Sequence, residues 1–228
     1  MTNDVPLYPS TEAPTPTTKT LVHLVRHGEV FNPKKVLYGR LDGYHLSELG
    51  REMAEVTSQW LAPRDITYLV SSPLERAQET AAPLEEKLDL PVVLDPRVIE
   101  AGNDFEGLTV GSNPKQLLQP RFWPKLVNPL RPSWGEPYQE IAERMYTAIL
   151  DARDAAAGHE AAVVSHQLPV WTARRFAEGK RLWHDPRSRE CTLASVTTIE
   201  FTGDEITGVQ YAEPAGRLLP NSTQSVGA

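Results

Sequence analysis

The sequence contains a single cysteine, Cys191, among its 228 residues. One cysteine forms no disulfide within the chain, and a metal site built from several cysteines is excluded. The sequence also lacks an apolar run long enough to span a bilayer, and its first residues have neither the basic start nor the apolar core of a secretory signal. These absences predict a cytoplasmic protein without a membrane partner.

An excess of basic residues is missing as well. Aspartate and glutamate outnumber lysine and arginine by 30 to 23, which gives a formal net charge of −7. A nucleic-acid-binding surface normally requires a basic excess, so we expect no nucleic-acid partner. The length and the 40% hydrophobic content favour one domain with a sizeable core. A homodimer is compatible with this composition, but the sequence does not decide the oligomeric state.

The composition divides the chain into three parts. Residues 1–18 are rich in proline, threonine and serine, and we expect a disordered leader there. A single domain is expected over residues 19–213, with an irregular, proline-rich insertion at about 96–137 near the active site. We expect residues 214–228 to form a disordered tail.

Strand-like and helix-like segments alternate within the domain. Short apolar runs rich in β-branched residues predict strands, and apolar residues at helical spacing predict amphipathic helices between them. The alternation predicts an α/β fold, a three-layer α/β/α sandwich with a mostly parallel central sheet. The predicted strands lie at 21–25, 66–70, 92–94 and 161–164, with a closing hairpin at 195–211, and the predicted helices lie at about 48–62, 73–88, 137–158 and 168–178.

The stretch TLVHLVRHGEV at residues 20–30 contains the most informative pattern. Its apolar run predicts a strand buried on both faces, and Arg26, His27 and Gly28 follow this run without a spacer. In open α/β sheets ligands bind at the carboxyl ends of the strands. The three residues are therefore expected where a ligand would bind.

Three further segments place polar residues just beyond a strand-like run. They read VSSPLERAQETAA from Val70, VIEAGNDFEG from Val98 and VVSHQ from Val163. Together with the RHG stretch, and in this order, they resemble the motifs of the histidine phosphatase superfamily, the phosphoglycerate mutase-like proteins. The resemblance covers about residues 19–201 and implies a phosphoglycerate mutase-like fold.

These residue types suit phosphoryl transfer. A phosphate monoester is dianionic and has a poor leaving group, so a catalyst needs a nucleophile, fixed positive charge and an acid. The neutral imidazole of His27 is a competent nucleophile, and Arg26 and Arg76 match phosphate oxygens with planar, permanently charged forks. The resemblance implies that His27 becomes phosphorylated and that Arg26, Arg76 and His166 form the phosphate pocket.

The proton donor is open between two residues. One branch of the superfamily has an acidic residue directly after its second motif histidine, where this chain has Gln167. The branch of mutases and small bacterial phosphatases has a glutamate after the third strand. The resemblance assigns that role to Glu100, with Asp104 as the alternative. Burial beside a phosphate anion would raise the pKa of such a carboxyl, as an acid at neutral pH requires.

Substrate contacts are expected from Gln167 and from the loop that follows the first strand. Asn32 stands one residue earlier than the asparagine of many relatives, and we expect it to reach the phosphate through a shifted loop. The segment LYGRLDGYHLSELG resembles the family pattern GRxDxxLxxxG, which implies that Gly39 and Arg40 border the pocket. Arg40 either binds substrate or phosphate, or braces the loop through Asp42.

The other histidines are given structural roles. His23 lies inside the first predicted strand and is expected to be a hydrogen-bonded core residue. His45, His159 and His184 are interpreted as surface or loop residues. No dense spacing of carboxylates and histidines indicates a metal site, and we expect no cofactor.

The sequence as a whole predicts a metal-independent phosphomonoester hydrolase that acts on a small phosphorylated metabolite through a phosphohistidine. A phosphoglycerate mutase-type transferase is the alternative, although the insertion lacks the paired arginines with which mutases bind a phosphorylated carboxylic acid. A non-catalytic module that senses phosphate is a third hypothesis, and the complete set of motif residues disfavours it. The sequence defines neither the substrate nor whether the 96–137 insertion acts as a lid.

Overall fold

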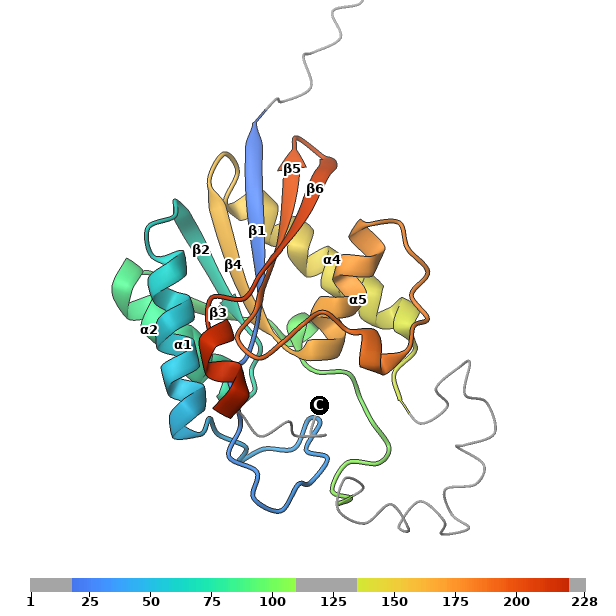
Figure 1. Cartoon of the computed structure of the whole chain (residues 1–228). Helices are drawn as coiled ribbons and strands as arrows, with labels where there is room; N and C mark the ends of the chain where they lie inside the picture. Colours follow the sequence, from blue (N-terminus) through green and yellow to red (C-terminus); the bar gives the residue numbers. More distant parts are fainter. Residues whose placement is uncertain (1–17, 110–134, 222–228) are drawn as a thin grey trace, which may run out of the picture.

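The computed structural model describes residues 18–109 and 135–221. In this part of the chain a six-stranded sheet has the strand order β3-β2-β4-β1-β5-β6 (Figure 1). The strands are β1 Lys19–Arg26, β2 Ile66–Ser71, β3 Val92–Leu94, β4 Glu160–Ser165, β5 Val196–Thr202 and β6 Glu205–Ala212. The helices are α1 Glu48–Leu61, α2 Glu75–Leu88, α4 Tyr138–Ala155 and α5 Gln167–Ala177, with short 3₁₀ helices η1 Pro96–Val98, η4 Pro186–Ser188 and η5 Gly216–Asn221.

The strands β1 to β4 form the parallel part of the sheet. β4 lies between β1 and β2, and β3 pairs with β2, all in parallel register. β5 pairs antiparallel with β1, and β6 returns along β5 as a hairpin. Parallel neighbours require crossover connections, which the helices between them provide. The prediction of a mostly parallel α/β sheet is confirmed.

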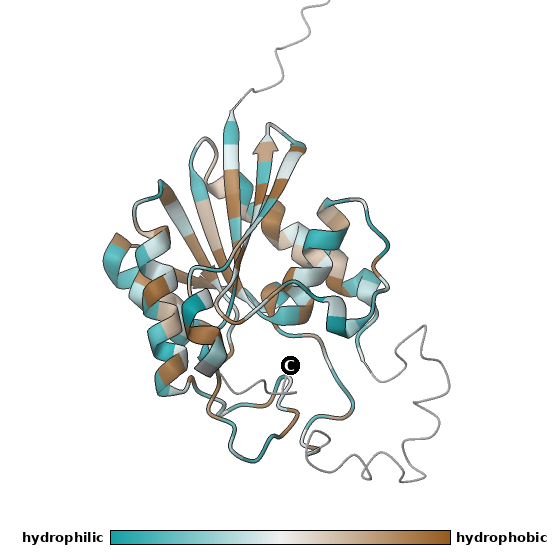
Figure 2. Ribbon diagram, viewed as in Figure 1, coloured by the Kyte–Doolittle hydropathy of each residue, from teal (hydrophilic) through white to brown (hydrophobic). Residues whose placement is uncertain are grey.

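Helices cover both faces of this sheet, with α1 and α2 on one side and α4 and α5 on the other (Figure 1). Successive side chains of a strand point to opposite faces, and β4 shows the consequence. Ala161 and Val163 pack with apolar residues of α4 and α5, whereas Ala162 and Val164 pack with those of α1 and α2. Hydrophobic and hydrophilic residues alternate in bands along the helices, and the strands contain long hydrophobic stretches (Figure 2). The predicted three-layer sandwich is confirmed.

The carboxyl ends of β1, β4 and β2 lie side by side. Arg26 at the end of β1 is in register with Ser165 at the end of β4. The backbone amides of His27 and Ser72 donate to the carbonyl oxygens of Ser165 and Val164 at 3.0 and 2.9 Å. This pairing brings the residues that follow three different strands to one edge of the sheet.

His23 is a core residue, as predicted. Its side chain is fully buried, its Nδ1 lies 2.8 Å from the hydroxyl oxygen of Thr198, and its Nε2 lies 2.5 Å from a carboxylate oxygen of Glu160. Burial lowers the pKa of His23, and the Glu160 carboxylate opposes this effect. The ring therefore joins neighbouring strands through polar contacts inside the sheet.

Among the four α-helices of the described residues, only α1 has a side-chain cap at its N-terminus. Ser47 caps α1, since its hydroxyl accepts from the amide of Gly50 at 2.9 Å. The prediction that Pro73 lies in the first turn of α2 is wrong, because α2 begins at Glu75 and Leu74 occupies the N-cap position. No helix within the described ranges is long and apolar enough to cross a membrane.

The prediction of a disordered tail from residue 214 is wrong for residues 215–221. There η5 places Leu218, together with Ala215, against Met53 of α1, and all three side chains are buried. Leu49 and Val56 of α1 pack against the same cluster, so α1 provides an apolar surface for this segment. The predictions for residues 1–17, for residues 110–134 of the insertion and for residues 222–228 lie outside the described residues.

We expect Leu218→Ala to lower the free energy of unfolding by about 2 kcal/mol, because it removes a buried side chain and leaves a cavity against α1. Urea unfolding of the purified protein measures this change. Arg217→Ala is the control, since Arg217 is exposed and its truncation should change stability by less than about 0.5 kcal/mol. Equal stability of the two variants would contradict the packing of η5 on α1.

Candidate active site

His27 is the first residue after β1, and its side chain is fully buried. Its Nδ1 lies 2.7 Å from the carbonyl oxygen of Gly28. A carbonyl only accepts hydrogen bonds, so Nδ1 bears the proton and Nε2 bears a free lone pair. Nε2 is buried and has no hydrogen-bond partner among the described residues. Burial, followed by the charges of Arg76 and Arg26, lowers the pKa of His27 well below its usual value, so the ring is neutral.

Gly28 allows the start of α1 to lie directly against this strand end. A Cβ atom at position 28 would lie 2.5 Å from the carbonyl oxygen of Gly50. The amide of Gly28 also donates to the hydroxyl of Thr80 in α2 at 3.1 Å. A larger residue at position 28 would therefore displace α1 and the histidine backbone together.

Two buried arginines flank His27. Arg26 ends β1 and donates through Nη1 to the carbonyl oxygen of Cys191 at 2.7 Å. Arg76 lies in the first turn of α2 and donates through Nη2 to the carbonyl oxygen of Gly39 at 2.6 Å. Three other guanidinium nitrogens are buried without partners in the described part of the chain, namely Nε of Arg26 and both Nε and Nη1 of Arg76. The backbone thus orients each guanidinium and leaves donors available for an anion.

His166 follows β4 and lies across from His27, with 5.1 Å between the two ring centroids. Its Nε2 lies 2.8 Å from the hydroxyl oxygen of Ser72, which follows β2, and its Nδ1 is buried without a partner among the described residues. Burial lowers the pKa of His166 well below its usual value, and the charge of Arg76 and the nearby His27 lower it further. An anion between the two rings would favour the protonated form of His166.

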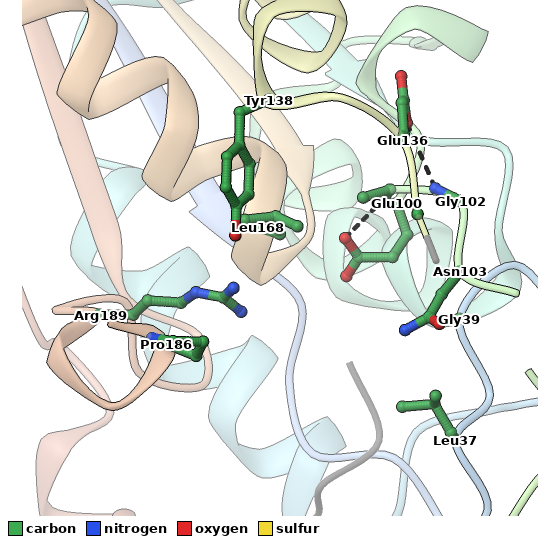
Figure 3. Close-up of a pocket in the computed structure, with 12 residues that line it drawn as sticks. Leu37, Gly39, Glu100, Gly102, Asn103, Glu136, Tyr138, Leu168, Pro186 and Arg189 are labelled. Carbon is green, nitrogen blue, oxygen red and sulfur yellow. Dashed lines mark hydrogen bonds between the residues drawn. The ribbon is translucent and has the colours of Figure 1, made fainter. Parts of the chain in front are cut away.

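Glu100 follows η1 and completes the group. Its Oε1 accepts from the amide of Ala101 at 2.8 Å, while its Oε2 is buried without a partner in the described ranges. Burial raises the pKa of Glu100, although the Ala101 amide and the charges of Arg76 and Arg26 act in the opposite direction. The carboxyl group points into a cavity (Figure 3). The alternative acid, Asp104, is exposed.

Buried polar atoms without partners are concentrated at this one place. Of the eleven such side-chain atoms in the described residues, six belong to the five residues of this group. An unpaired buried polar group costs about 1–3 kcal/mol, so such a concentration indicates a ligand site. Several donors around one neutral imidazole fit an anion with several oxygens. The five residues are Arg26, His27, Arg76, Glu100 and His166.

A network of ion pairs and hydrogen bonds fixes the backbone at Ile99 and Glu100. Arg144 of α4 contacts the carboxylate of Glu136 through Nε and Nη2 at 2.7 and 3.0 Å, and Arg40 contacts it through Nη2 at 2.7 Å. Arg40 also donates through Nε to the carbonyl oxygen of Glu100 at 2.7 Å, and Arg144 donates through Nη1 to that of Ile99 at 2.8 Å. The network joins three segments around the peptide of Glu100.

Residues 22–214 match the sequence model of the histidine phosphatase superfamily, branch 1. The chain belongs to this superfamily. The Mycobacterium tuberculosis protein named "Uncharacterized protein Rv0525" is 55% identical over 197 residues, which cover 86% of this chain and 98% of that protein. The probable phosphoglycerate mutase GpmB of Yersinia pestis is 32% identical over 156 residues, which cover 65% of this chain and 70% of that protein.

Solved structures show the same fold. YhfR of Bacillus stearothermophilus has a TM-score of 0.67 and 27% identity, and the match covers 82% of this chain and 94% of YhfR. A mycobacterial glucosyl-3-phosphoglycerate phosphatase, Rv2419c, solved in complex with VO3, has a TM-score of 0.64 and 26% identity, with 84% and 96% of the chains covered. The phosphoglycerate mutase-like fold is confirmed.

The histidine phosphatase fold brings together all five residues predicted as catalytic. Gly39 lines the cavity beside Glu100, as expected. The predicted brace between Arg40 and Asp42 is wrong, because Arg40 pairs with Glu136 instead. Glu136 is distant in the sequence, and no local pattern indicates this contact.

Two predicted substrate contacts have intramolecular partners. The Asn32 side chain donates to the carbonyl of Val36 at 2.8 Å and accepts from its amide at 3.0 Å, which closes the loop on itself. The Gln167 side chain lies 3.4 Å from the carbonyl oxygen of Cys191 and, through Oε1, 3.4 Å from Nη1 of Arg189. Contacts of Asn32 and Gln167 with substrate stay predictions.

Sequence patterns missed several residues of the site. Ser72 lies inside a motif but has no charge that would indicate a role. Tyr138 and Arg189 line the cavity from segments that match no motif. The interpretation of His184 as a surface or loop residue is half right, since it lies in a loop but is buried next to Tyr138 and Trp171. The sequence did not indicate this burial, because His184 lies only two residues before an exposed proline.

A metal centre finds no support in the described ranges. There, no group of three or more histidine, cysteine, aspartate or glutamate side chains gathers in a way that would hold a metal ion. Around His27, the charges of Arg76 and Arg26 and the ring of His166 suit an anion rather than a cation.

We expect orthophosphate to raise the thermal unfolding midpoint, because it would supply acceptors for the unpartnered guanidinium nitrogens. At a hundredfold excess over Kd the shift should be about 5 °C or more, compared with chloride at equal ionic strength. Arg76→Met should lose most of this shift. Arg64→Met, which removes a part-buried arginine far from the site, should keep it. The same shift in both variants would contradict an anion site at Arg76.

Proposed function

We propose that the protein is a phosphomonoester hydrolase that needs no metal ion and acts through a phosphohistidine at His27. The observation that supports this proposal most directly is that Nε2 of His27 and donors of Arg26 and Arg76 are buried without partners among the described residues. A neutral nucleophile within a buried cationic site is what attack on a dianionic phosphate ester requires.

In the first step Nε2 of His27 attacks phosphorus and the bond from phosphorus to the ester oxygen breaks. The proton on Nδ1 stays in its hydrogen bond to the Gly28 carbonyl, which stabilises the positive charge on the phosphorylated ring. The leaving oxygen takes the proton of Glu100, which becomes a carboxylate. In the second step this carboxylate takes a proton from water, the water oxygen attacks phosphorus, and the N–P bond breaks to release orthophosphate.

Charge that develops on the phosphoryl oxygens would be stabilised by Arg26, Arg76 and a protonated His166. The carbonyls of Cys191 and Gly39 fix the two guanidinium groups before substrate binds, so little reorganisation is needed. The Ser72 hydroxyl orients His166 in the same manner. Solved relatives include a phosphatase in complex with VO3, which is consistent with this use of the site.

A mutase is the second candidate, because one relative at 32% identity is named as a probable phosphoglycerate mutase. Both reactions begin with phosphorylation of the histidine and differ in the acceptor, which is water in one and a second hydroxyl in the other. Isomerisation of 3-phosphoglycerate in the presence of a bisphosphate primer, without net phosphate release, would favour the mutase.

We expect His27→Ala to reduce hydrolysis of p-nitrophenyl phosphate by about a thousandfold or more, because the covalent intermediate cannot form. The assay is phosphate release with excess EDTA, and the wild-type rate should not change when EDTA is added. His45→Ala is the control, since His45 is exposed and pairs with Glu79 outside the site. Activity that survives in His27→Ala, or that depends strictly on added magnesium or zinc, would contradict the proposal.

We expect Glu100→Gln to slow alkyl phosphates far more than p-nitrophenyl phosphate, by about 10²-fold or more, because a good leaving group needs no proton. The acid is active only while protonated, and burial raises its pKa. The wild-type rate on alkyl phosphates should therefore fall as pH rises through this raised pKa, and Glu100→Gln should lose that decline. Equal losses on both substrates would place the acid elsewhere, and Asp104→Asn is the matched comparison.

A further inference from the structure

A cavity of about 140 Å³ lies next to the carboxyl group of Glu100. Arg189 forms the wall of this cavity opposite Glu100 (Figure 3). This volume is smaller than the roughly 300–1,000 Å³ of most ligand pockets. Leu37, Leu168 and Pro186 provide apolar lining. In Figure 3 the Arg189 guanidinium points into the space, and the Tyr138 hydroxyl points toward the guanidinium.

Arg189 has only neutral hydrogen-bond partners within the described residues. It donates through Nε to Nε2 of His184 at 2.9 Å and through Nη1 to Oε1 of Gln167 at 3.4 Å, and the Tyr138 hydroxyl is a further neutral partner. The neighbouring acids Glu178 and Glu190 pair with Arg174 instead. Residues 110–134 contain no aspartate or glutamate. Within the described residues, a largely desolvated cation therefore faces the cavity without an ion-pair partner.

The two acidic residues of the cavity do not neutralise Arg189. Glu136 already pairs with Arg144 and Arg40. Glu100 raises the pKa of Arg189 only through space, without an ion pair, and in the proposed reaction it enters protonated and therefore uncharged. Desolvation of an arginine without a counter-charge is unfavourable, so a bound anion would stabilise this arrangement.

The position of Glu100 decides which part of a substrate occupies the cavity. Glu100 feels the charges of Arg76 and Arg26 at the phosphate site, and it lines the same cavity as Arg189. An acid that protonates the leaving oxygen must contact it, so the leaving group extends from the phosphate site past Glu100 into the cavity. Arg189 consequently meets the leaving group and not the phosphoryl group.

We propose that Arg189 is a specificity-determining residue that binds a carboxylate on the leaving group, so that the preferred substrates are phosphate monoesters of small hydroxy acids. The inference rests on the proposed hydrolase. A carboxylate bears the single negative charge that one guanidinium balances, and its two oxygens match the planar fork. The small cavity admits a short acid and excludes large leaving groups.

The test compares 3-phosphoglycerate with glycerol 3-phosphate, which differ only in a carboxylate against a hydroxymethyl group. Phosphate release should give the wild type a kcat/KM about tenfold to a hundredfold higher for the acid, the range that a charge-assisted hydrogen bond supports. Arg189→Gln should bring this ratio close to one, mainly through KM for the acid. Arg189→Lys should keep part of the preference, because it keeps the charge and loses the fork.

The ratio is measured within each preparation, so a partly unfolded variant does not change it. Arg187→Gln is the matched control, since Arg187 lies two residues away, is exposed and pairs with Asp185 outside the cavity. It should retain the wild-type ratio. A merely structural role for Arg189 predicts equal losses on both substrates, and that result would overturn the assignment.

The proposed function and the inference fail in different ways. Persistence of hydrolysis in His27→Ala would refute the hydrolase mechanism itself. Hydrolysis of p-nitrophenyl phosphate that depends on His27, combined with no preference of the wild type for the carboxylate-bearing ester, would overturn the role of Arg189 alone. A preference that Arg189→Gln leaves intact would do the same.

Discussion

The structure depends on positive charge that is buried without an ion pair among the described residues. Arg26 and Arg76 are placed beside two neutral histidines, and in the described part of the chain only the carbonyl oxygens of Cys191 and Gly39 accept their hydrogen bonds. Burial of an unpaired charge opposes folding by several kcal/mol, and the apolar layers on both faces of the sheet have to outweigh this penalty. A phosphate ester supplies the missing charge. The same feature that weakens the ligand-free fold therefore creates affinity for the ligand.

Such a site survives only if the backbone around it cannot relax. The parallel pairing of β1, β4 and β2 fixes where the three strands end, and the close approach of Gly28 to Gly50 fixes α1 against that edge. The arginines cannot turn outward without breaking carbonyl contacts inside this frame. Because the arginines are oriented when the protein folds, the free-energy cost of orienting them is part of folding. This cost does not recur in each reaction cycle.

The sequence predicted the parts of this arrangement that depend on local order. The burial of β4 on both faces follows from its continuous apolar run, and the capped α1 follows from Ser47 and a helical pattern. The resemblance of the motifs anticipated the gathering of His27, Arg76 and His166. Contacts between distant segments were not accessible. Arg40 pairs with Glu136 rather than with the nearby Asp42, because the segment that leads into α4 passes along the cavity. Arg189 belongs to no motif, and its desolvation at the cavity without an acidic partner among the described residues distinguishes it from a surface arginine.

Glu100 links the two halves of the site through opposing electrostatic effects. Desolvation favours its neutral form, whereas Arg76, Arg26 and Arg189 favour its carboxylate. A bound phosphate would cancel the charge of the first two arginines, and an acid group in the cavity would cancel that of the third. Each part of such a substrate thereby removes a force that deprotonates Glu100, so the donor holds its proton best when both parts are bound. Binding of an acidic leaving group at Arg189 would then also favour the protonated, active form of Glu100. An uncharged alcohol of equal size would not have this electrostatic effect.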